Sequence, residues 1–206
     1  MSPSPSPSPS PVALGGSRSL SVSMQAVVSA VVQAVLAGGG SVSVGCCVGA
    51  DAQVIQSVLA AGGAARLSVF GVGGLLCGVG RGWCSLSALP AVLAAAAAGA
   101  RVSWWAGGSS VVPLAARLIR RSQAVVSSAQ ALVLFQPGSG SLAVAAIAVA
   151  QGKTVLAFSG HSLPVLPGGC QPPAPIPGCA GAWVPSFFAG FACLQWQPAQ
   201  VSLFEL

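Results

Sequence analysis

"ALVLFQPGSGSLAVAAIAVAQGKTVLAF", residues 131–158, contains a single charged residue, Lys153. Such a stretch forms either a membrane hairpin or the buried strand, loop, helix and strand of a parallel sheet. A membrane-spanning helix needs about 18 or more consecutive apolar residues, and here Gly, Ser and Pro interrupt the apolar runs at shorter intervals. Strands buried on both faces are continuous apolar runs, as ALVLF and TVLAF are. We therefore predict a crossover unit of a parallel sheet and no membrane segment.

The same alternation extends over the whole stretch from residue 12 to residue 158. Short β-branched runs follow longer Ala-, Val- and Leu-rich segments, which is the pattern of repeated strand–helix units. Strands are predicted at 12–14, 41–45, 66–72, 101–105, 131–135 and 153–158. Helices are predicted at 22–37, 51–61, 87–100, 111–129 and 142–151. We therefore expect an α/β fold, a Rossmann-like parallel sheet with helices on both faces, in a single domain.

The composition changes on either side of this expected domain. Residues 1–11 repeat Ser-Pro and are expected to form a disordered tail and not a signal peptide, because they lack a basic and an apolar region. Residues 159–198 form a Pro- and Gly-rich, then aromatic, extension, in which 183–196 is expected to pack back on the sheet. Residues 199–206 form a C-terminal peptide.

Charged residues make up only 5% of the 206 residues, with eight Lys and Arg against two Asp and Glu. A sparse basic excess suits phosphate-bearing partners, and such an uncharged surface favours self-association, so we expect a homo-oligomer. The seven cysteines form no CxxC pair, and His161 is the one histidine. Zinc sites need short paired spacings. We therefore expect no metal site, and cysteines that act as small buried apolar residues in a reducing cytoplasm.

Four predicted loops at the carboxyl ends of strands are rich in Gly and Ser: 15–18, 45–51, 106–110 and 136–141. In doubly wound sheets, the loops at this edge form the ligand crevice. Small residues let backbone N–H groups approach a phosphate, and the N-terminus of the following helix adds a positive dipole. The sequence therefore predicts an anion-binding crevice.

Charged side chains near this edge have two interpretations each. Arg18 either bonds a phosphate or caps strand ends at the surface. Asp51 either caps a helix or serves as a ribose-hydroxyl acceptor or catalytic carboxylate. Arg117, Arg120 and Arg121 are spaced i, i+3, i+4, which puts them on one helix face that is either solvated or turned toward phosphate.

Four segments follow one another in a recognisable order: GSRSL, VGCCVGAD, RLIRRSQAVVSSAQALVLF and PGSGS…QGKTVLAF. This succession resembles the SLOG superfamily of Rossmann-like proteins, which includes the DNA-processing protein DprA (Smf) and the LOG phosphoribohydrolases. The resemblance covers about residues 12–158 and is closest to small bacterial and phage-type members. It implies binding of a nucleotide or of single-stranded DNA.

The resemblance and the predicted loops together give a set of nucleotide- or phosphate-binding residues. From the resemblance come Gly16, Ser17, Arg18, Gly49, Asp51, Pro137, Gly138, Gly140 and Ser141, together with Arg120 or Arg121 from the long helix. The Gly-rich loops and the helix face add Gly107, Arg117 and Ser139.

An enzymatic role is disfavoured by one departure from the family. LOG enzymes have the motif P-G-G-x-G-T-x-x-E with a catalytic Glu, whereas here the loop is shorter and Leu-Ala-Val-Ala follows it. Cleavage of an N-glycosidic bond needs a group that stabilises or deprotonates the reacting centre. We therefore expect a binding protein, with Asp51 as the catalytic residue if it is an enzyme. The alternatives are a nucleotide hydrolase of the LOG type, a signal-nucleotide sensor, or a member retained for assembly. No cofactor beyond a nucleotide ligand is implied.

Two further features bear on partners. Trp104 and Trp105 follow a predicted strand, where they would stack on bases or, for at least one of them, pack in the core. Residues 200–204, Gln-Val-Ser-Leu-Phe, match the Q-L-[SD]-L-F pattern by which bacterial replication and repair proteins dock on the sliding clamp. In that role, Leu203 and Phe204 would be apolar anchors and Gln200 would bond at the pocket rim. A last edge strand is the alternative.

Overall fold

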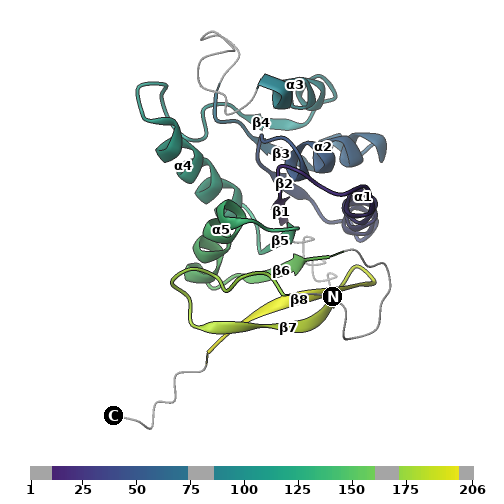
Figure 1. The fold of residues 1–206 in the computed structure, drawn as a ribbon. Coiled ribbons are helices and arrows are strands. Elements are labelled where there is room, and N and C mark those ends of the chain that lie inside the picture. Colours follow the sequence, from purple (N-terminus) through teal and green to yellow (C-terminus); the bar gives the residue numbers. More distant parts are fainter. Residues whose placement is uncertain (1–10, 74–85, 161–171, 200–206) are drawn as a thin grey trace, which may run out of the picture.

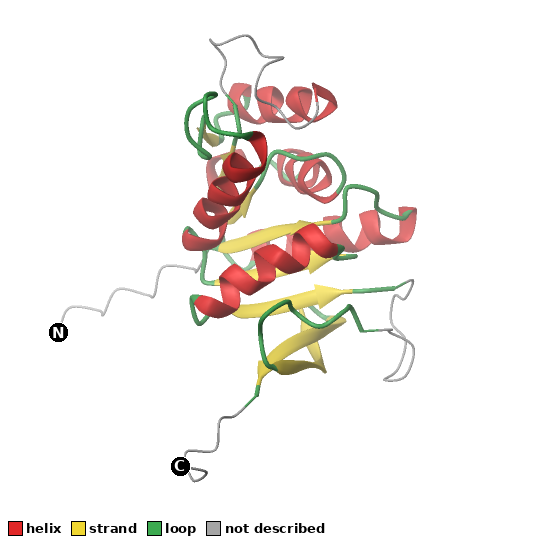
Figure 2. Cartoon of the chain, turned by 60° about the vertical axis from the view of Figure 1, so that its left-hand side comes forward, coloured by secondary structure: helices red, strands yellow, loops and turns green. Residues whose placement is uncertain are grey.

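An eight-stranded sheet with helices on both faces forms the body of the protein (Figure 1, Figure 2). The structure is a computed structural model that describes residues 11–73, 86–160 and 172–199. The strand order is β4-β3-β2-β1-β5-β6-β8-β7, in which β1 to β6 are parallel to one another and β8 runs antiparallel to β6 and β7. The predicted Rossmann-like α/β fold is confirmed.

The elements follow the predicted alternation. The strands are β1 (Val12–Gly16), β2 (Val42–Val44), β3 (Leu67–Phe70), β4 (Arg101–Ser103), β5 (Ala131–Phe135), β6 (Thr154–Phe158), β7 (Gly181–Phe188) and β8 (Phe191–Pro198). The helices are α1 (Val22–Ala37), α2 (Ala50–Ala60), α3 (Leu89–Ala97), α4 (Leu114–Ser127) and α5 (Ser139–Ala150), with short 3-10 turns at Ala64–Arg66 and Leu86–Ala88.

Each face of the sheet is covered by its own set of helices. Successive side chains of a strand point to opposite faces, so in β5 Val133 and Phe135 pack with α1, α2 and α3, whereas Leu132 and Leu134 pack with α4 and α5. Phe135 stacks on Phe158 of β6 at a centroid distance of 5.5 Å. The two cores explain why β5 and β6 contain apolar residues at every buried position.

The starts of α4 and α5 each differ from the prediction by three residues, and both matter for the site. Helix α5 begins at Ser139 and not at residue 142, because Gly138 is its N-cap and the Ser-Gly-Ser loop residues form its first turn. Helix α4 begins at Leu114 and not at residue 111, because Pro113 precedes it. A proline disfavours helical geometry in the residue before it. The end of the predicted loop 136–141 is therefore helical, whereas the beginning of the predicted helix 111–129 is not.

The aromatic extension packs back on the sheet as a hairpin. Strand β8 pairs with β6 through Ala157 and Leu194, and it pairs with β7 along its full length. Trp196 is buried and meets Trp183 edge to face at 5.3 Å. The hairpin turns at Ala189 and Gly190, which both have positive φ, as a two-residue turn of type I′ requires.

Several sequence predictions concern residues that the structure does not describe. They include the tail up to residue 10, His161, and the clamp-docking residues Gln200, Leu203 and Phe204, so the sliding-clamp interaction stays a prediction. Among the described residues, no helix combines the length and the apolar character that crossing a bilayer requires. Within the same ranges, no three His, Cys, Asp or Glu side chains come together as a metal-binding group.

Lys153, the one lysine of the sequence, lies just before β6 and connects this edge of the sheet to α4. Lys153 donates through Nζ to the carbonyl oxygens of Val126 and Ala129 at the C-terminal end of α4, where a cation also complements the helix dipole. We expect Lys153→Met to lower the free energy of unfolding in urea by about 1–3 kcal/mol. Gln151→Ala, which removes only exposed side-chain hydrogen bonds with Ser127, should change it by less than about 0.5 kcal/mol. Equal effects of the two substitutions would contradict this role.

Candidate phosphate-binding site

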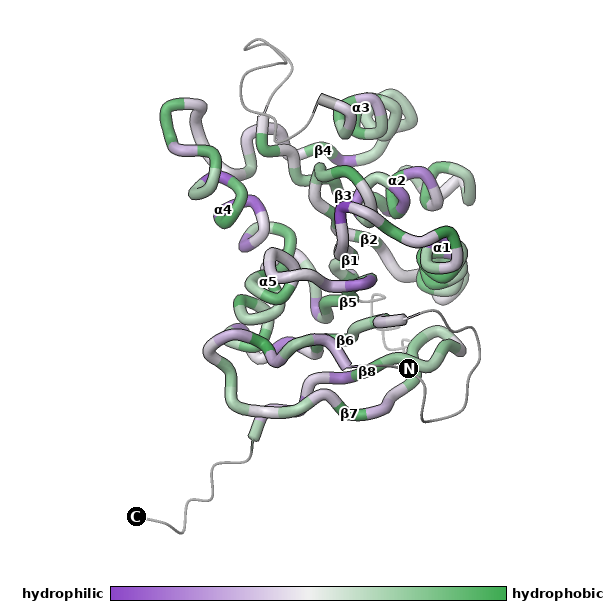
Figure 3. Tube along the Cα trace, in the orientation of Figure 1, coloured by the Kyte–Doolittle hydropathy of each residue, from purple (hydrophilic) through white to green (hydrophobic). Residues whose placement is uncertain are grey.

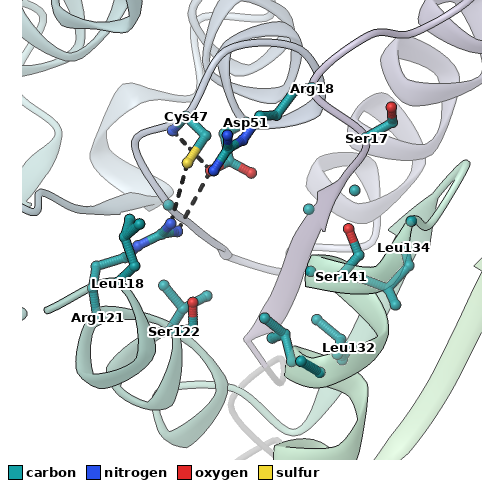
Figure 4. Close-up of a pocket in the computed structure, with 18 of the residues that line it drawn as sticks. Ser17, Arg18, Cys47, Asp51, Leu118, Arg121, Ser122, Leu132, Leu134 and Ser141 are labelled. Carbon is teal, nitrogen blue, oxygen red and sulfur yellow. Dashed lines mark hydrogen bonds and ion pairs between the residues drawn. The ribbon is translucent and has the colours of Figure 1, made fainter. Parts of the chain in front are cut away.

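A pocket of about 580 Å³ opens at the carboxyl ends of β1, β2 and β5, between α4 and α5 (Figure 4). Three of the four predicted loops reach it, whereas residues 106–110 do not line it. Nine predicted site residues line the pocket: Gly16, Ser17, Arg18, Asp51, Arg121, Gly138, Ser139, Gly140 and Ser141. Five others do not: Gly49, Gly107, Arg117, Arg120 and Pro137.

Backbone hydrogen bonds fix the first two loops to each other and to β5. Ser17 N–H donates to the Phe135 carbonyl at 2.9 Å, and Ala50 N–H donates to the Ser17 carbonyl at 2.9 Å. A Cβ at Gly16 would overlap the backbone of Phe135, and one at Gly49, which has φ of +77°, would overlap the backbone of Ser17. These two glycines are therefore required by the approach of the loops to one another.

Gln136, which sequence reasoning missed, connects the third loop to α1. Its Nε2 donates to Ser21 Oγ and its Oε1 accepts from Ser21 N–H, both at 3.1 Å. Ser21 is the N-cap of α1, and the backbone N–H of Gln136 donates to the Phe158 carbonyl at 2.7 Å. The one sequence feature that could have indicated this role is that Gln136 is a polar residue directly after a buried strand.

An ion pair forms one wall of the pocket (Figure 4). Arg121 Nη1 lies 3.5 Å from Asp51 Oδ2, and the two residues are only 8% and 7% exposed. The same carboxylate oxygen accepts the N–H of Cys47 at 2.9 Å, and Arg121 Nη2 donates to Cys47 Sγ at 3.2 Å. A side chain at Gly45 would occupy the space of the guanidinium, so glycine there admits the pair.

Burial dominates the electrostatics of Asp51. Desolvation raises the pKa of this carboxyl above its ordinary value, while the charge of Arg121, hydrogen bonds from Cys47 and the charge of Arg18 act in the opposite direction. The net direction is upward. The carboxylate is therefore held less firmly in its charged form than an exposed aspartate.

The three predicted helix arginines do not form one patch. Arg117 is buried outside the pocket, where Nε donates to the Val112 carbonyl at 3.0 Å and Nη1 to the Val72 carbonyl at 3.1 Å. Arg120 is exposed and its guanidinium lies beside Gly108. Arg121, one turn after Arg117, points to the pocket (Figure 4). On the tube of Figure 3, the hydrophilic positions of α4 alternate with apolar ones.

Gly107, in the loop that does not reach the pocket, has a packing role. A Cβ there would overlap the backbone carbonyl of Arg117, so the glycine lets the loop approach α4. Trp104, just before it, packs against the core on the α1 side, and Trp105 is half-buried with φ of +56°. Neither tryptophan lines the pocket.

The first turn of α5 forms the opposite wall. The leading N–H groups of a helix have no partner within the helix and stand at its positive end. Gly138 and Gly140 differ from the other loop glycines, because neither has a positive φ and a Cβ at either position would meet nothing within 4 Å. The fold itself therefore does not require glycine at these two positions. A ligand that approaches the backbone closely would require glycine there, because a side chain would stand in its way.

Beyond this polar end, the pocket is apolar. Its walls include Leu118 and Ile119 of α4 and Val144 and Ile147 of α5, and Ile119 is 56% exposed. A pocket with anion-binding groups at one end and an apolar trough beside them suits a ligand with both an anionic and a flat apolar part.

Comparisons with known proteins agree with this architecture. No family model matches the sequence, and no curated protein matches it. Among solved structures, DNA processing protein A from Helicobacter pylori, described in a single-stranded DNA binding mode, matches with a TM-score of 0.57 and 14% identity over 72% of this chain. DprA from Streptococcus pneumoniae matches with a TM-score of 0.53 and 19% identity over 73% of it. This chain spans 64% and 50% of those two chains, respectively. The protein therefore has a Rossmann-like fold of the type seen in DprA.

Proposed function

We propose that this protein binds single-stranded DNA, with a backbone phosphate at the first turn of α5. The observation that carries the proposal is the pair of glycines, Gly138 and Gly140, at the open N-terminus of α5 inside the pocket. Backbone N–H groups and the helix dipole bind phosphate there without a side chain. The likeness to the Helicobacter pylori protein, whose structure is described as giving insight into its single-stranded DNA binding mode, favours DNA over other phosphate-bearing ligands.

Cationic side chains supply charge on the other side of the pocket. Arg18 lies exposed at the rim and Arg121 lies deeper, beside Asp51. An arginine fork matches the geometry of two phosphate oxygens. Between these walls, the apolar trough of Leu118 and Val144 suits the flat face of a base. A nucleotide presents the same two parts, so free nucleotides are expected to compete for the pocket.

Hydrolysis is less well supported than binding. Asp51 Oδ2 already accepts from Cys47 N–H and pairs with Arg121, so this carboxylate is engaged by the protein and not presented to the reacting centre of a substrate. Helix α5 has no acidic residue in its first turn. We therefore assign Asp51 no catalytic step.

Gly140→Ala separates binding from stability. Alanine is favoured over glycine within a helix by about 0.5–1 kcal/mol, and a Cβ here meets no other atom, so the variant should be slightly more stable in urea. The same methyl group stands at the pocket wall, and we expect the affinity for a fluorescein-labelled oligothymidylate to fall about tenfold, or ~1.4 kcal/mol. The affinity is measured by fluorescence anisotropy. An affinity equal to that of the wild type would contradict phosphate binding at α5.

A further inference from the structure

Asp51 is the one acidic side chain among the described residues, and it faces the pocket. The sequence contains only two acids, and the second, Glu205, lies outside the described ranges. Three charged or titratable groups lie against Asp51: Arg121 from α4, Arg18 from the loop after β1, and Cys47 from the loop after β2 (Figure 4). Helices α1 and α2 and the start of α5 place no other charged side chain near it.

The Asp51 carboxylate forms an ion pair with Arg121, the arginine to which the proposed phosphate ligand would bind. Arg121 and Asp51 both line the pocket and lie 3.5 Å apart. Opposite charges at such a separation attract strongly when they are shielded from water. A phosphate that approaches Arg121 must therefore compete with Asp51 for the guanidinium, and it brings a second negative charge toward the buried carboxylate.

We propose that Asp51 is a built-in competitor for Arg121, so that phosphate binding breaks the Arg121–Asp51 ion pair and the Asp51 carboxylate takes up one proton from solvent. The proton converts the displaced carboxylate to a neutral carboxyl, which removes its repulsion of the phosphate. Cys47 N–H still has an oxygen to donate to. This inference rests on the proposed function, because it requires an anionic ligand in the pocket.

The electrostatics of Asp51 agree with such a coupling. Burial already raises the pKa of Asp51, and Arg121 is the strongest influence that opposes the rise. A phosphate that takes over Arg121 weakens this opposition, so the pKa in the complex lies higher still. Linkage then sets the sign: affinity is highest at pH below the pKa of the free protein, and it falls as pH rises to the pKa of the complex.

The test uses the full chain and an oligothymidylate with a tetramethylrhodamine label, because neither its phosphodiesters nor this label titrates between about pH 5 and pH 8. We expect Asp51→Asn to bind about tenfold more tightly at neutral pH and to lose the pH dependence of the wild type. The amide keeps an oxygen for Cys47 N–H. Glu205→Gln is the matched control, because it makes the same change in net charge and should leave both properties unaltered.

A measurement on the wild type keeps the inference testable if Asp51→Asn fails to fold. Calorimetry of oligothymidylate binding in buffers of different ionisation enthalpy gives the number of protons taken up, which should be positive and close to one where Asp51 is charged in the free protein and neutral in the complex. Binding without proton uptake, or weaker binding by Asp51→Asn, would overturn the inference and leave the proposed function standing. No binding by the wild type would overturn both.

Discussion

Gly16→Ala is expected to lower the free energy of unfolding by about 2–4 kcal/mol, because an added methyl group forces apart two backbones. Gly16 ends β1 and is paired with Phe135 of β5 in the sheet register. A Cβ on Gly16 would overlap the Phe135 carbonyl and backbone nitrogen, and backbone atoms cannot rotate aside as a flexible side chain can. The neighbouring bond from Ser17 N–H to the same carbonyl would be strained as well.

The control for this prediction is a glycine in the same pocket that has free space. Gly138→Ala adds the same methyl group where nothing lies within 4 Å, and it should change the stability by less than about 0.5 kcal/mol. Urea denaturation followed by tryptophan fluorescence gives both values. If both variants lost the same stability, the loop contacts of Gly16 would not be the cause.

Arg121→Ala is expected to destabilise the protein by about 3–5 kcal/mol at neutral pH, because it leaves the Asp51 carboxylate without its buried partner. Without Arg121, the pKa of Asp51 rises further, since burial then acts with less opposition. An acid whose pKa is higher in the folded state stabilises most below its unfolded pKa, and this stability is lost as pH rises through the folded pKa. The defect should therefore shrink as the pH is lowered.

A double variant shows whether the ion pair is the cause. Asp51→Asn/Arg121→Ala has neither charge, and most of the stability lost in Arg121→Ala should return in urea unfolding at neutral pH. Arg120→Ala, on the exposed side of the same helix, serves as the control and should change stability by less than about 0.5 kcal/mol. A defect of Arg121→Ala that is independent of pH and persists in the double variant would contradict this explanation.

Much of the fold could be predicted because the buried strands are unusually apolar. The range 131–135 was predicted with the bounds that β5 has, and the start of α1 and its end agree as well. The start of α5 was placed three residues too late, because Ser139 and Gly140 are typical of loops, although in the structure they form a helical turn. Local composition does not distinguish a loop from the first turn of the helix that follows it.

The site was predictable only as far as topology determines it. Parallel strands bring their carboxyl ends to one edge, so three of the Gly-rich loops meet as expected. The spacing of Arg117, Arg120 and Arg121 fixes their angles about α4, but it does not fix which side of α4 faces the pocket. Arg121 and Asp51 lie 70 positions apart in the sequence, and no local sequence pattern predicts that they are in contact.

The affinity of the wild type for labelled oligothymidylate, measured by fluorescence anisotropy across a salt series, tests the central claim most directly. Each phosphate neutralised on a single strand contributes about −0.7 to the slope of log K against log salt concentration. Two pocket arginines, Arg18 and Arg121, predict a slope of about −1.4, reduced by about half in Arg18→Ala and unchanged in Arg101→Ala, on β4 at the far edge of the sheet. No binding at low salt, or an affinity that salt and Arg18→Ala leave unchanged, would contradict the assignment of this pocket to single-stranded DNA.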